Sequence, residues 1–267
     1  MNFTLKIMGT ASAMPISDRN PSAQMLEVHG RLFLLDCGEG TQKQMRRMHL
    51  SFVKVEAIFI THIHGDHLFG LFGLLNSMAM YGRTGRLDIY GPQALGGVLN
   101  FYRNFFGQGT LFEIVFHPLT GKGIELVHES KWVNVSAFPL KHMIDCYGFR
   151  FDEKVTERHM REDPDYIPAS YAYCSDTMPF AALSSYVKGV RTLYHEATYM
   201  EEMADKAFSR GHSTTTQAAR CALEAGAGRL IVGHYSSRIT DFDSYISECR
   251  KVFESTIAAQ DGDIFEI

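Results

Sequence analysis

The 267-residue sequence contains no long hydrophobic run. Its longest apolar stretches are interrupted by polar residues every few positions, whereas a helix needs about 20 consecutive apolar residues to span a membrane. Residues 1–7 alternate as a strand does and lack the basic and apolar regions of a signal peptide. We therefore expect a cytoplasmic protein that does not enter a membrane.

The sequence also lacks a disulfide framework. Its five cysteines are an odd number without paired spacing, so we expect free thiols in a reducing compartment. Cys146 and Cys174 lie near two of the candidate ligands below, but we interpret both as small buried hydrophobic residues. Repeats, low-complexity tracts and linkers are absent, and the length suits one large core, so residues 1–267 are expected to form a single domain.

The chain has no strong excess of charge, because its formal net charge is −4 at pH 7. Proteins that bind nucleic acids usually have an excess of basic residues. The mild acidity therefore argues weakly against a large polyanionic partner. It does not exclude one, since bound dications would add positive charge where a phosphate must lie.

The most informative segment is residues 61–67, Thr-His-Ile-His-Gly-Asp-His. It follows an apolar run at residues 55–60 that predicts a buried strand, and Gly65 allows a sharp turn. The segment offers four metal ligands: His62, His64, Asp66 and His67. The first two can bind one ion and the last two a second, with zinc, manganese or iron favoured over calcium. The alternative, a group of hydrogen-bonded histidines without metal, leaves their mutual repulsion without a cation to offset it.

Apolar periodicity predicts alternating strands and helices. Strands are expected at residues 4–8, 24–28, 32–36, 55–60, 87–90, 191–194 and 229–232, with several more between residues 112 and 151. Helices are expected at residues 41–48, 68–81, 92–106, 179–187, 214–225 and 241–258. The simplest architecture is an α/β sandwich of the αββα type, in which two mixed β-sheets are flanked by helices.

The order His-x-His-x-Asp-His resembles the metal loop of the metallo-β-lactamase superfamily. Three further strand patterns, at residues 133–138, 171–174 and 230–233, are each followed by a potential ligand: His142, Asp176 and His234. The resemblance implies an αββα fold and two ions bridged by Asp176. The ligands it implies for one ion are His62, His64, His142 and Asp176. Those for the other are Asp66, His67, Asp176 and His234.

Further motifs narrow the resemblance to ribonuclease Z, a family that trims tRNA precursors at the 3′ end. The similar motifs are Arg-Asn-Pro at 19–21, Asp-Cys-Gly-Glu-Gly-Thr-Gln at 36–42, His-Glu-Ala-Thr at 195–198, His-Ser-Thr at 212–214 and His-Tyr-Ser-Ser-Arg at 234–238. This combination is far more specific than the metal loop. It implies a phosphodiester hydrolase with two zinc ions per chain, manganese or iron being possible substitutes, and precursor tRNA as substrate.

The resemblance also suggests which residues carry the chemistry. Asp66 would orient the attacking water and accept its proton, and His212 would protonate the departing 3′-oxygen. Glu196 would hydrogen-bond His212 and keep it charged and oriented. The alternative for His212 is a structural position just before the helix at residue 214, which Ser213 or Thr214 would cap.

Three other polar residues of these motifs have weaker assignments. Ser236 and Arg238 are candidates for binding a substrate phosphate, with a plain surface role as the alternative. His195 is expected to be structural, because it lies at a strand end. The apolar helix that follows His67 is the candidate interface of a homodimer.

The sequence departs from the ribonuclease Z pattern between His142 and Asp176. The family usually carries there a long tRNA-binding arm, but residues 152–166 form a mixed-charge segment that leaves no room for one. Phe72 and Ser175 also replace a usual proline and glycine. The alternative function is therefore an armless phosphodiesterase acting on small or cyclic phosphodiesters. A non-catalytic binding protein is a third hypothesis, which the full set of ligands disfavours.

Overall fold

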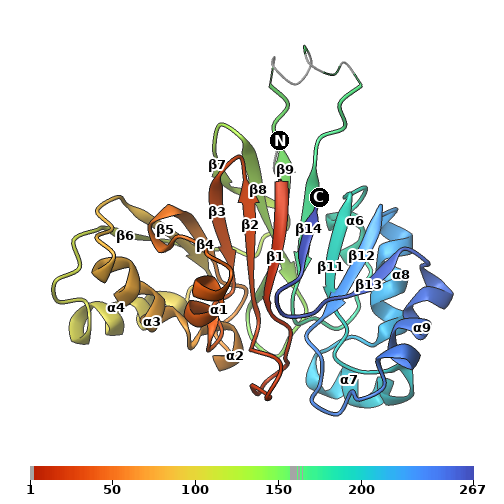
Figure 1. Cartoon of the computed structure of the whole chain (residues 1–267). Helices are drawn as coiled ribbons and strands as arrows, with labels where there is room; N and C mark the ends of the chain where they lie inside the picture. Colours follow the sequence, from red (N-terminus) through yellow and green to blue (C-terminus); the bar gives the residue numbers. More distant parts are fainter. Residues whose placement is uncertain (1–2, 157–160, 162, 164) are drawn as a thin grey trace.

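Two β-sheets lie face to face at the centre of the molecule, with helices on both outer faces (Figure 1). This computed structural model describes residues 3–156, 161, 163 and 165–267. Within those residues each sheet has seven strands, and parallel and antiparallel pairs occur in both. The predicted αββα sandwich is therefore confirmed, and no described helix is long and apolar enough to cross a membrane.

The first sheet has the order β14-β1-β2-β3-β4-β5-β6. In that order its strands are Ile264–Glu266, Phe3–Gly9, Ala23–Val28, Arg31–Leu35, Val55–Phe59, Leu87–Gly91 and Ile114–Pro118. The helices that follow its strands are α1 (Thr41–Arg47), η1 (Phe52–Lys54), α2 (Gly65–Leu68), α3 (Leu71–Met80) and α4 (Leu95–Phe105). Figure 1 shows α1 to α4 on the side of this sheet that faces away from the other sheet.

The second sheet has the order β13-β12-β11-β10-β9-β8-β7. In that order its strands are Thr256–Ala258, Arg229–Gly233, Thr192–Glu196, Ser170–Cys174, Cys146–Glu153, Val133–Leu140 and Glu125–Glu129. The helices on its side are α6 (Leu183–Tyr186), η2 (Glu201–Met203), α7 (Ala204–Arg210), α8 (Thr215–Ala225) and α9 (Phe242–Val252). Thr214 caps α8 with a capping box that includes the Gln217 side chain.

Buried side chains form one core between the sheets and one beneath each helical layer. Phe33 and Phe59 of the first sheet meet Phe149 and Phe151 of the second in the central core. Each such side chain contributes roughly 1.5–3 kcal/mol when it is fully buried. This packing fixes the two sheets against each other, so that loops at one edge of the sandwich hold constant positions.

Four expected helices differ from the structure. The helix expected at residues 68–81 is interrupted at Phe69–Gly70, because the Gly70 amide donates to the Cys37 carbonyl at 2.9 Å instead of continuing the helix. The helix expected at 92–106 begins at Leu95 instead. Only Leu183–Tyr186 is α-helical within 179–187, and residues 256–258 of the last expected helix are strand β13, which pairs in parallel with β12.

The connection between β9 and β10 is short. It spans residues 154–169, and part of the expected loop or short helix there, at residues 157–160, 162 and 164, lies outside the described residues. Because β9 starts beside the loop of His142 and β10 runs toward Asp176, this connection lies at the opposite end of these strands. It is therefore remote from the candidate ligands of its own chain.

Candidate active site

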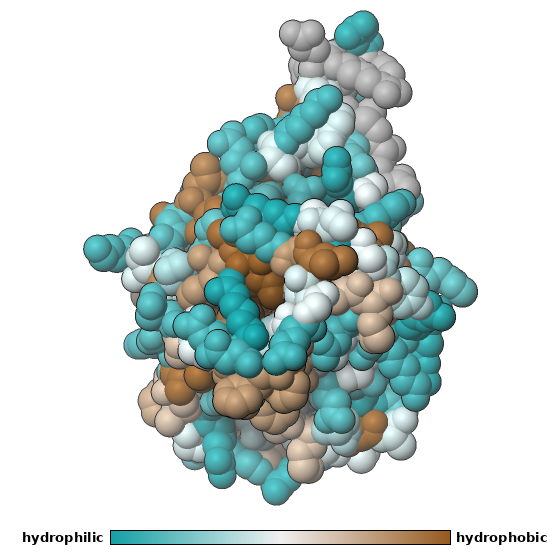
Figure 2. Space-filling model, turned by 90° about the vertical axis from the view of Figure 1, so that its left-hand side faces the viewer, coloured by the Kyte–Doolittle hydropathy of each residue, from teal (hydrophilic) through white to brown (hydrophobic). Residues whose placement is uncertain are grey.

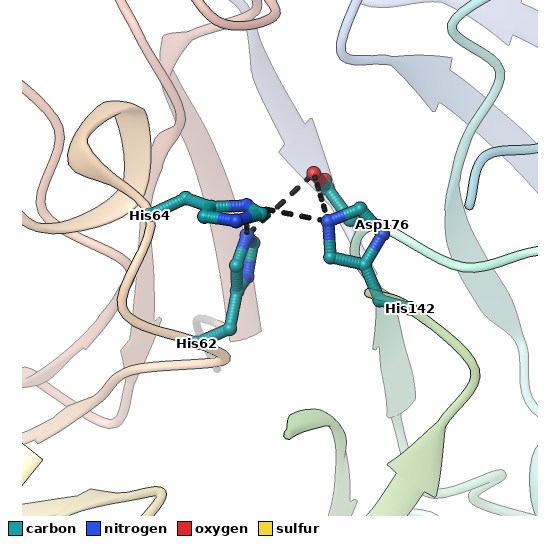
Figure 3. Close-up of side chains that lie close together, drawn as sticks. All are labelled: His62, His64, His142 and Asp176. Carbon is teal, nitrogen blue, oxygen red and sulfur yellow. Dashed lines mark hydrogen bonds and ion pairs between the residues drawn. The ribbon is translucent and has the colours of Figure 1, made fainter. Parts of the chain in front are cut away.

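Loops at one edge of the sandwich carry the candidate ligands. Each loop follows the carboxyl end of a strand, and the strands are β3, β4, β8, β10, β11 and β12. In the same order, these strand ends position Asp36, His62, His142, Asp176, Glu196 and His234. Asp36 and Glu196 are not candidate ligands but contact His67 and His212. Figure 3 shows His62 and His64 approaching from the first sheet, and His142 and Asp176 from the second. The site is thus built where the two sheets meet.

The first group of ligand atoms consists of three imidazoles and one carboxylate oxygen: His62, His64, His142 and Asp176. His64 Nδ1 lies 3.0 Å from His62 Nε2 and 3.2 Å from His142 Nε2. Asp176 Oδ2 lies 3.6 Å and 3.7 Å from the same two Nε2 atoms. Four ligands at Zn–N distances of about 2.0–2.1 Å stand roughly 3.3 Å apart in a tetrahedron. The four atoms therefore have the separations of ligands around one ion.

The second group uses the other oxygen of Asp176. Asp176 Oδ1 lies 3.4 Å from His67 Nε2 and 3.3 Å from His234 Nε2. These two nitrogens are 3.2 Å apart, and Asp66 Oδ2 is 3.5 Å and 3.4 Å from them. The carboxylate of Asp176 therefore faces both groups, with one oxygen toward each. His234 has φ +61°, a left-handed conformation that is rare outside glycine and typical of functional sites.

Outer hydrogen bonds fix which nitrogen of four imidazoles faces the ligand groups. The Nδ1 atoms of His62, His67, His142 and His234 lie 2.8–3.0 Å from the Thr61 hydroxyl, Asp36, the Gly211 carbonyl and the Thr198 hydroxyl, respectively. Nε2 of each ring is left for the site. Such outer partners orient metal-ligating histidines and set their tautomer.

The electrostatics of the site favour a cation. Burial lowers the pKa of His67, but the carboxylates of Asp176, Asp66 and Asp36 outweigh it and raise that pKa well above its usual value. Burial raises the pKa of Asp66, yet His67 and His234 hold it well below its usual range. Three buried or nearly buried carboxylates thus surround one imidazole. The donor set of imidazole nitrogens and carboxylate oxygens fits a transition-metal cofactor.

His212 lies beside the ligand groups and is held by Glu196. Its Nδ1 is 3.2 Å from Glu196 Oε1 and 3.9 Å from Asp176 Oδ2. Burial lowers the pKa of His212, but the Glu196 and Asp176 carboxylates outweigh it and raise the pKa to about 9. Asp176, His212 and His234 also form a third group of potential metal ligands. Nδ1 already faces Glu196, so Nε2 is the nitrogen available to a substrate.

A cavity of about 930 Å³ opens over these groups. Its walls include His64, Asp66, His142, Asp176 and His212, together with Ser236 and Arg238. Ser236 is half-buried and Arg238 is exposed, so both can meet a ligand in the cavity. His195 does not line it, because His195 is buried at the end of β11 with Nδ1 2.6 Å from the Glu196 carbonyl oxygen. Burial raises the pKa of the thiols of Cys146 and Cys174, so both are neutral.

Three residues that position the ligands, Asp36, Tyr173 and Thr198, have no role predicted from the sequence. Asp36 accepts hydrogen bonds from the Thr61 amide at 2.8 Å and the Tyr173 hydroxyl at 2.9 Å, besides contacting His67. The Thr198 hydroxyl contacts His234 and donates to Glu196 at 2.8 Å. Asp36 ends an expected strand, and both Asp36 and Thr198 lie within motifs shared with ribonuclease Z, which was the available signal. Tyr173 lies inside an expected strand, and no sequence pattern there indicated a positioning role.

These ligand groups at the edge of an αββα sandwich define a hydrolase of the metallo-β-lactamase fold that uses a metal cofactor. The chain belongs to the ribonuclease Z family and, through a match of residues 3–207, to the family described as anti-Pycsar protein Apyc1. It is 36% identical to ribonuclease Z of Porphyromonas gingivalis over 295 positions, which cover 97% of each chain. Ribonuclease Z of Cytophaga hutchinsonii is also 36% identical, over 100% of this chain and 97% of the relative.

Solved structures agree with this assignment. Human tRNase Z, short form, superposes with a TM-score of 0.83 at 28% identity and 99% coverage of each chain. The metallo-β-lactamase fold protein YhfI from Bacillus subtilis has a TM-score of 0.80 at 19% identity, covers both chains fully and supports the fold alone. The 295-position alignment with the P. gingivalis relative exceeds the 267 residues of this chain, so that relative carries additional inserted residues.

Proposed function

We propose that this hydrolase is an endoribonuclease that cleaves precursor tRNA at the 3′ end. The observation that carries the proposal is the position of His212, which Glu196 holds next to the shared carboxylate Asp176. A proton donor at this place suits a reaction with a poor leaving group, such as the 3′-oxygen of a ribose. Similarity to ribonuclease Z over 97% of the chain supports RNA as the substrate.

The metal cofactor is proposed to be two zinc ions per chain, with manganese or iron as possible substitutes. His62, His64 and His142 would hold one, Asp66, His67 and His234 the other, and Asp176 both. Bound dications would stabilise negative charge on the phosphate and lower the pKa of water toward neutrality. The ligand–ligand separations of 3.0–3.7 Å support this assignment.

Asp66 is proposed to orient the attacking water. Its Oδ2 accepts a hydrogen bond from the Ala13 amide at 2.7 Å, which fixes the carboxylate at the cavity wall. Because the pKa of Asp66 is held low, its carboxylate stays ionised and can accept a hydrogen bond that orients the water, whose proton passes to solvent. The water oxygen bonds to phosphorus as the bond from phosphorus to the 3′-oxygen breaks.

His212 is proposed to protonate the departing 3′-oxygen through Nε2. Glu196 remains ionised, since burial raises its pKa but His212 outweighs this effect and the net shift is downward. The pair therefore keeps the imidazole charged before the reaction. The products are one strand ending in a 3′-hydroxyl and one beginning with a 5′-phosphate.

A second candidate function is the hydrolysis of small or cyclic phosphodiesters. The short connection at residues 154–169 favours it, because a segment of that length cannot form a long arm that binds a distant part of a tRNA. The same residues would act on such a substrate, but contacts remote from the scissile bond would contribute little.

The experiment that separates the two functions compares substrates on the zinc- and manganese-loaded protein. Precursor tRNA, 2′,3′- and 3′,5′-cyclic nucleotides and bis-p-nitrophenyl phosphate are assayed at saturating concentration. We expect cleavage of the precursor at its 3′ end. If the cyclic nucleotides turn over and the precursor stays intact with both metals, the second candidate replaces the first.

A homodimer is proposed through an aromatic surface on α3 and α4. This surface consists of Phe72, Phe101, Phe105 and Phe106, of which the last three are 49%, 66% and 50% exposed. Figure 2 shows hydrophobic residues gathered among hydrophilic ones on the corresponding side of the molecule. α3 has no charged residue, so two copies could meet here without burying an unpaired charge from it. Cytoplasmic location is proposed on the five free, buried cysteines.

A further inference from the structure

Three cationic side chains form one wall of the cavity: Lys206, Arg210 and Arg238. The first two stand one turn apart on α7, so they share a face of that helix. They gather around Tyr199, whose ring centroid is 5.6 Å from Lys206 Nζ. Arg210 and Arg238 line the same cavity as this ring, and their charges oppose the rise in the pKa of the Tyr199 phenol that burial causes.

This wall is built onto the His212 side of the site. The Tyr199 and His212 ring centroids are 6.1 Å apart. The His212 amide donates to the Ala207 carbonyl of α7 at 2.9 Å, and the Gly211 carbonyl that ends α7 contacts Nδ1 of the ligand His142 at 2.8 Å. The position of α7, and of its cations, is therefore tied to the residues that carry the chemistry.

The three cations lack an ion-pair partner in the part of the chain that the structure describes. An uncompensated positive wall in a chain of net charge −4 indicates an anionic ligand. Arg210 lies in the last turn of α7, where a cation also stabilises the helix dipole. That effect does not account for Arg238, which lies in the loop after β12.

We propose that Lys206, Arg210 and Arg238 bind the phosphate on the 5′ side of the scissile phosphodiester. The inference rests on the proposed function, because His212 marks the side from which the 3′-oxygen departs. The nucleoside that carries this oxygen bears its own 5′-phosphate, which would lie beyond His212 against α7. The site therefore recognises a ribonucleotide chain with two consecutive phosphates rather than an isolated diester.

Three diribonucleotides test the assignment. One has a single phosphodiester, the second carries an additional 5′-phosphate and the third an additional 3′-phosphate. We expect the 5′-phosphate to raise kcat/KM at least about tenfold, mainly through KM, since charge-assisted contacts to a phosphate are strong. The 3′-phosphate should give no comparable gain. In Lys206→Met and Arg210→Gln the ratio between the second and first substrates should fall several-fold, while Arg220→Gln on α8, outside the cavity, should retain it.

The ratio is measured within each variant, so a general loss of activity cancels. A variant that unfolds at lower temperature but keeps the wild-type ratio would show a structural role and overturn the proposal. Equal gains from 5′- and 3′-phosphates would overturn it as well. If the protein cleaves RNA but shows no preference for the 5′-phosphorylated substrate, only the phosphate subsite is refuted and the proposed function stands. If cyclic nucleotides or bis-p-nitrophenyl phosphate are cleaved while the diribonucleotides and precursor tRNA stay intact, both the subsite and the proposed function are refuted.

Discussion

Glu196 does more than contact His212. Its buried carboxylate also accepts hydrogen bonds from the amides of Thr177, Thr198 and Ser213 at 3.2, 2.9 and 2.8 Å. These amides belong to three different loops at the same edge of the sandwich. Removing the carboxylate would therefore leave buried donors unsatisfied, at roughly 1–3 kcal/mol, so substitutions of His212 are the cleaner probe of proton donation.

His212→Ala is predicted to lower cleavage of precursor tRNA by roughly 10²–10⁴-fold, as expected for loss of a general acid. With bis-p-nitrophenyl phosphate the loss should be much smaller, because p-nitrophenolate departs without a proton. The measurement is single-turnover cleavage of both substrates. His117→Ala is a matched control, since His117 also pairs with a carboxylate, Asp88 at 2.6 Å, but does not line the cavity. Equal losses on both substrates would remove His212 from this role.

At the residue scale, four candidate ligands were predicted from the histidine-rich loop at residues 61–67. His142, Asp176 and His234 were predicted from the strand patterns they follow together with the resemblance to the metallo-β-lactamase superfamily. The structure brings all seven into two adjoining groups. The outer partners could not be assigned in the same way. Tyr173 contacts Asp36 across 137 positions of the chain, and only the packing of the two sheets brings them together. A hydrogen-bonding role of this kind leaves no local pattern.

At the scale of elements, a buried carboxylate anchors the connection between β9 and β10. Glu153 Oε2 accepts hydrogen bonds from the Tyr166 hydroxyl at 2.6 Å and the Ala169 amide at 2.8 Å, and Oε1 lies 2.9 Å from His29 Nε2. Burial raises the pKa of Glu153, but these partners outweigh it and hold the pKa below its usual value of 4.5. The ionised form therefore stabilises the fold.

Glu153→Gln is predicted to lower the free energy of unfolding by about 1–3 kcal/mol at pH 7. The folded-state pKa lies below the unfolded one, so the stabilisation is present above pH 4.5 and is lost as the pH falls through the folded value. The difference between variant and wild type should accordingly shrink below pH 4. Thermal unfolding at both pH values measures it. Glu129→Gln, at an exposed carboxylate that pairs with Lys154, is the control and should have little effect. A deficit that stays constant with pH would contradict this account.

The aromatic surface leads to a prediction about assembly. Phe105→Glu should convert the dimer into a monomer, because it places a charge within an apolar contact. Light scattering after size-exclusion chromatography measures the mass. Phe208→Glu on α7 introduces the same charge at another exposed phenylalanine and should leave the mass unchanged. A wild-type protein that is monomeric at high concentration would refute the interface.

Periodicity predicted most strands and helices but not their interruptions. The break between α2 and α3 arises because the Gly70 amide donates to the Cys37 carbonyl, a contact between segments that no local pattern reveals. Residues 256–258 form β13 because they pair with β12. In both places a contact distant in sequence determines the local conformation. The αββα class was predictable because apolar strands and helices alternate along most of the chain.

At the scale of the whole molecule, metal content should govern stability. We predict about two transition-metal ions per chain by elemental analysis, and fewer in Asp176→Ala, because both ligand groups use this carboxylate. Removal by a chelator should lower the unfolding temperature, since a ligand present at about 1,000 times its Kd stabilises the native state by about 4 kcal/mol. Adding zinc should restore it. A protein that binds neither zinc nor manganese would defeat the metal assignment.

The pairing of β14 with β1 has a consequence for synthesis on the ribosome. Residues 264–266 pair with residues 4–6 of β1, and the Ile267 amide donates to the Phe3 carbonyl at 2.9 Å. β1 therefore keeps one unpaired edge until residues 264–266 have emerged from the ribosome. An unpaired edge strand can pair with other chains. Translation that stalls before residue 264 would leave one edge of β1 open to aggregation with other chains.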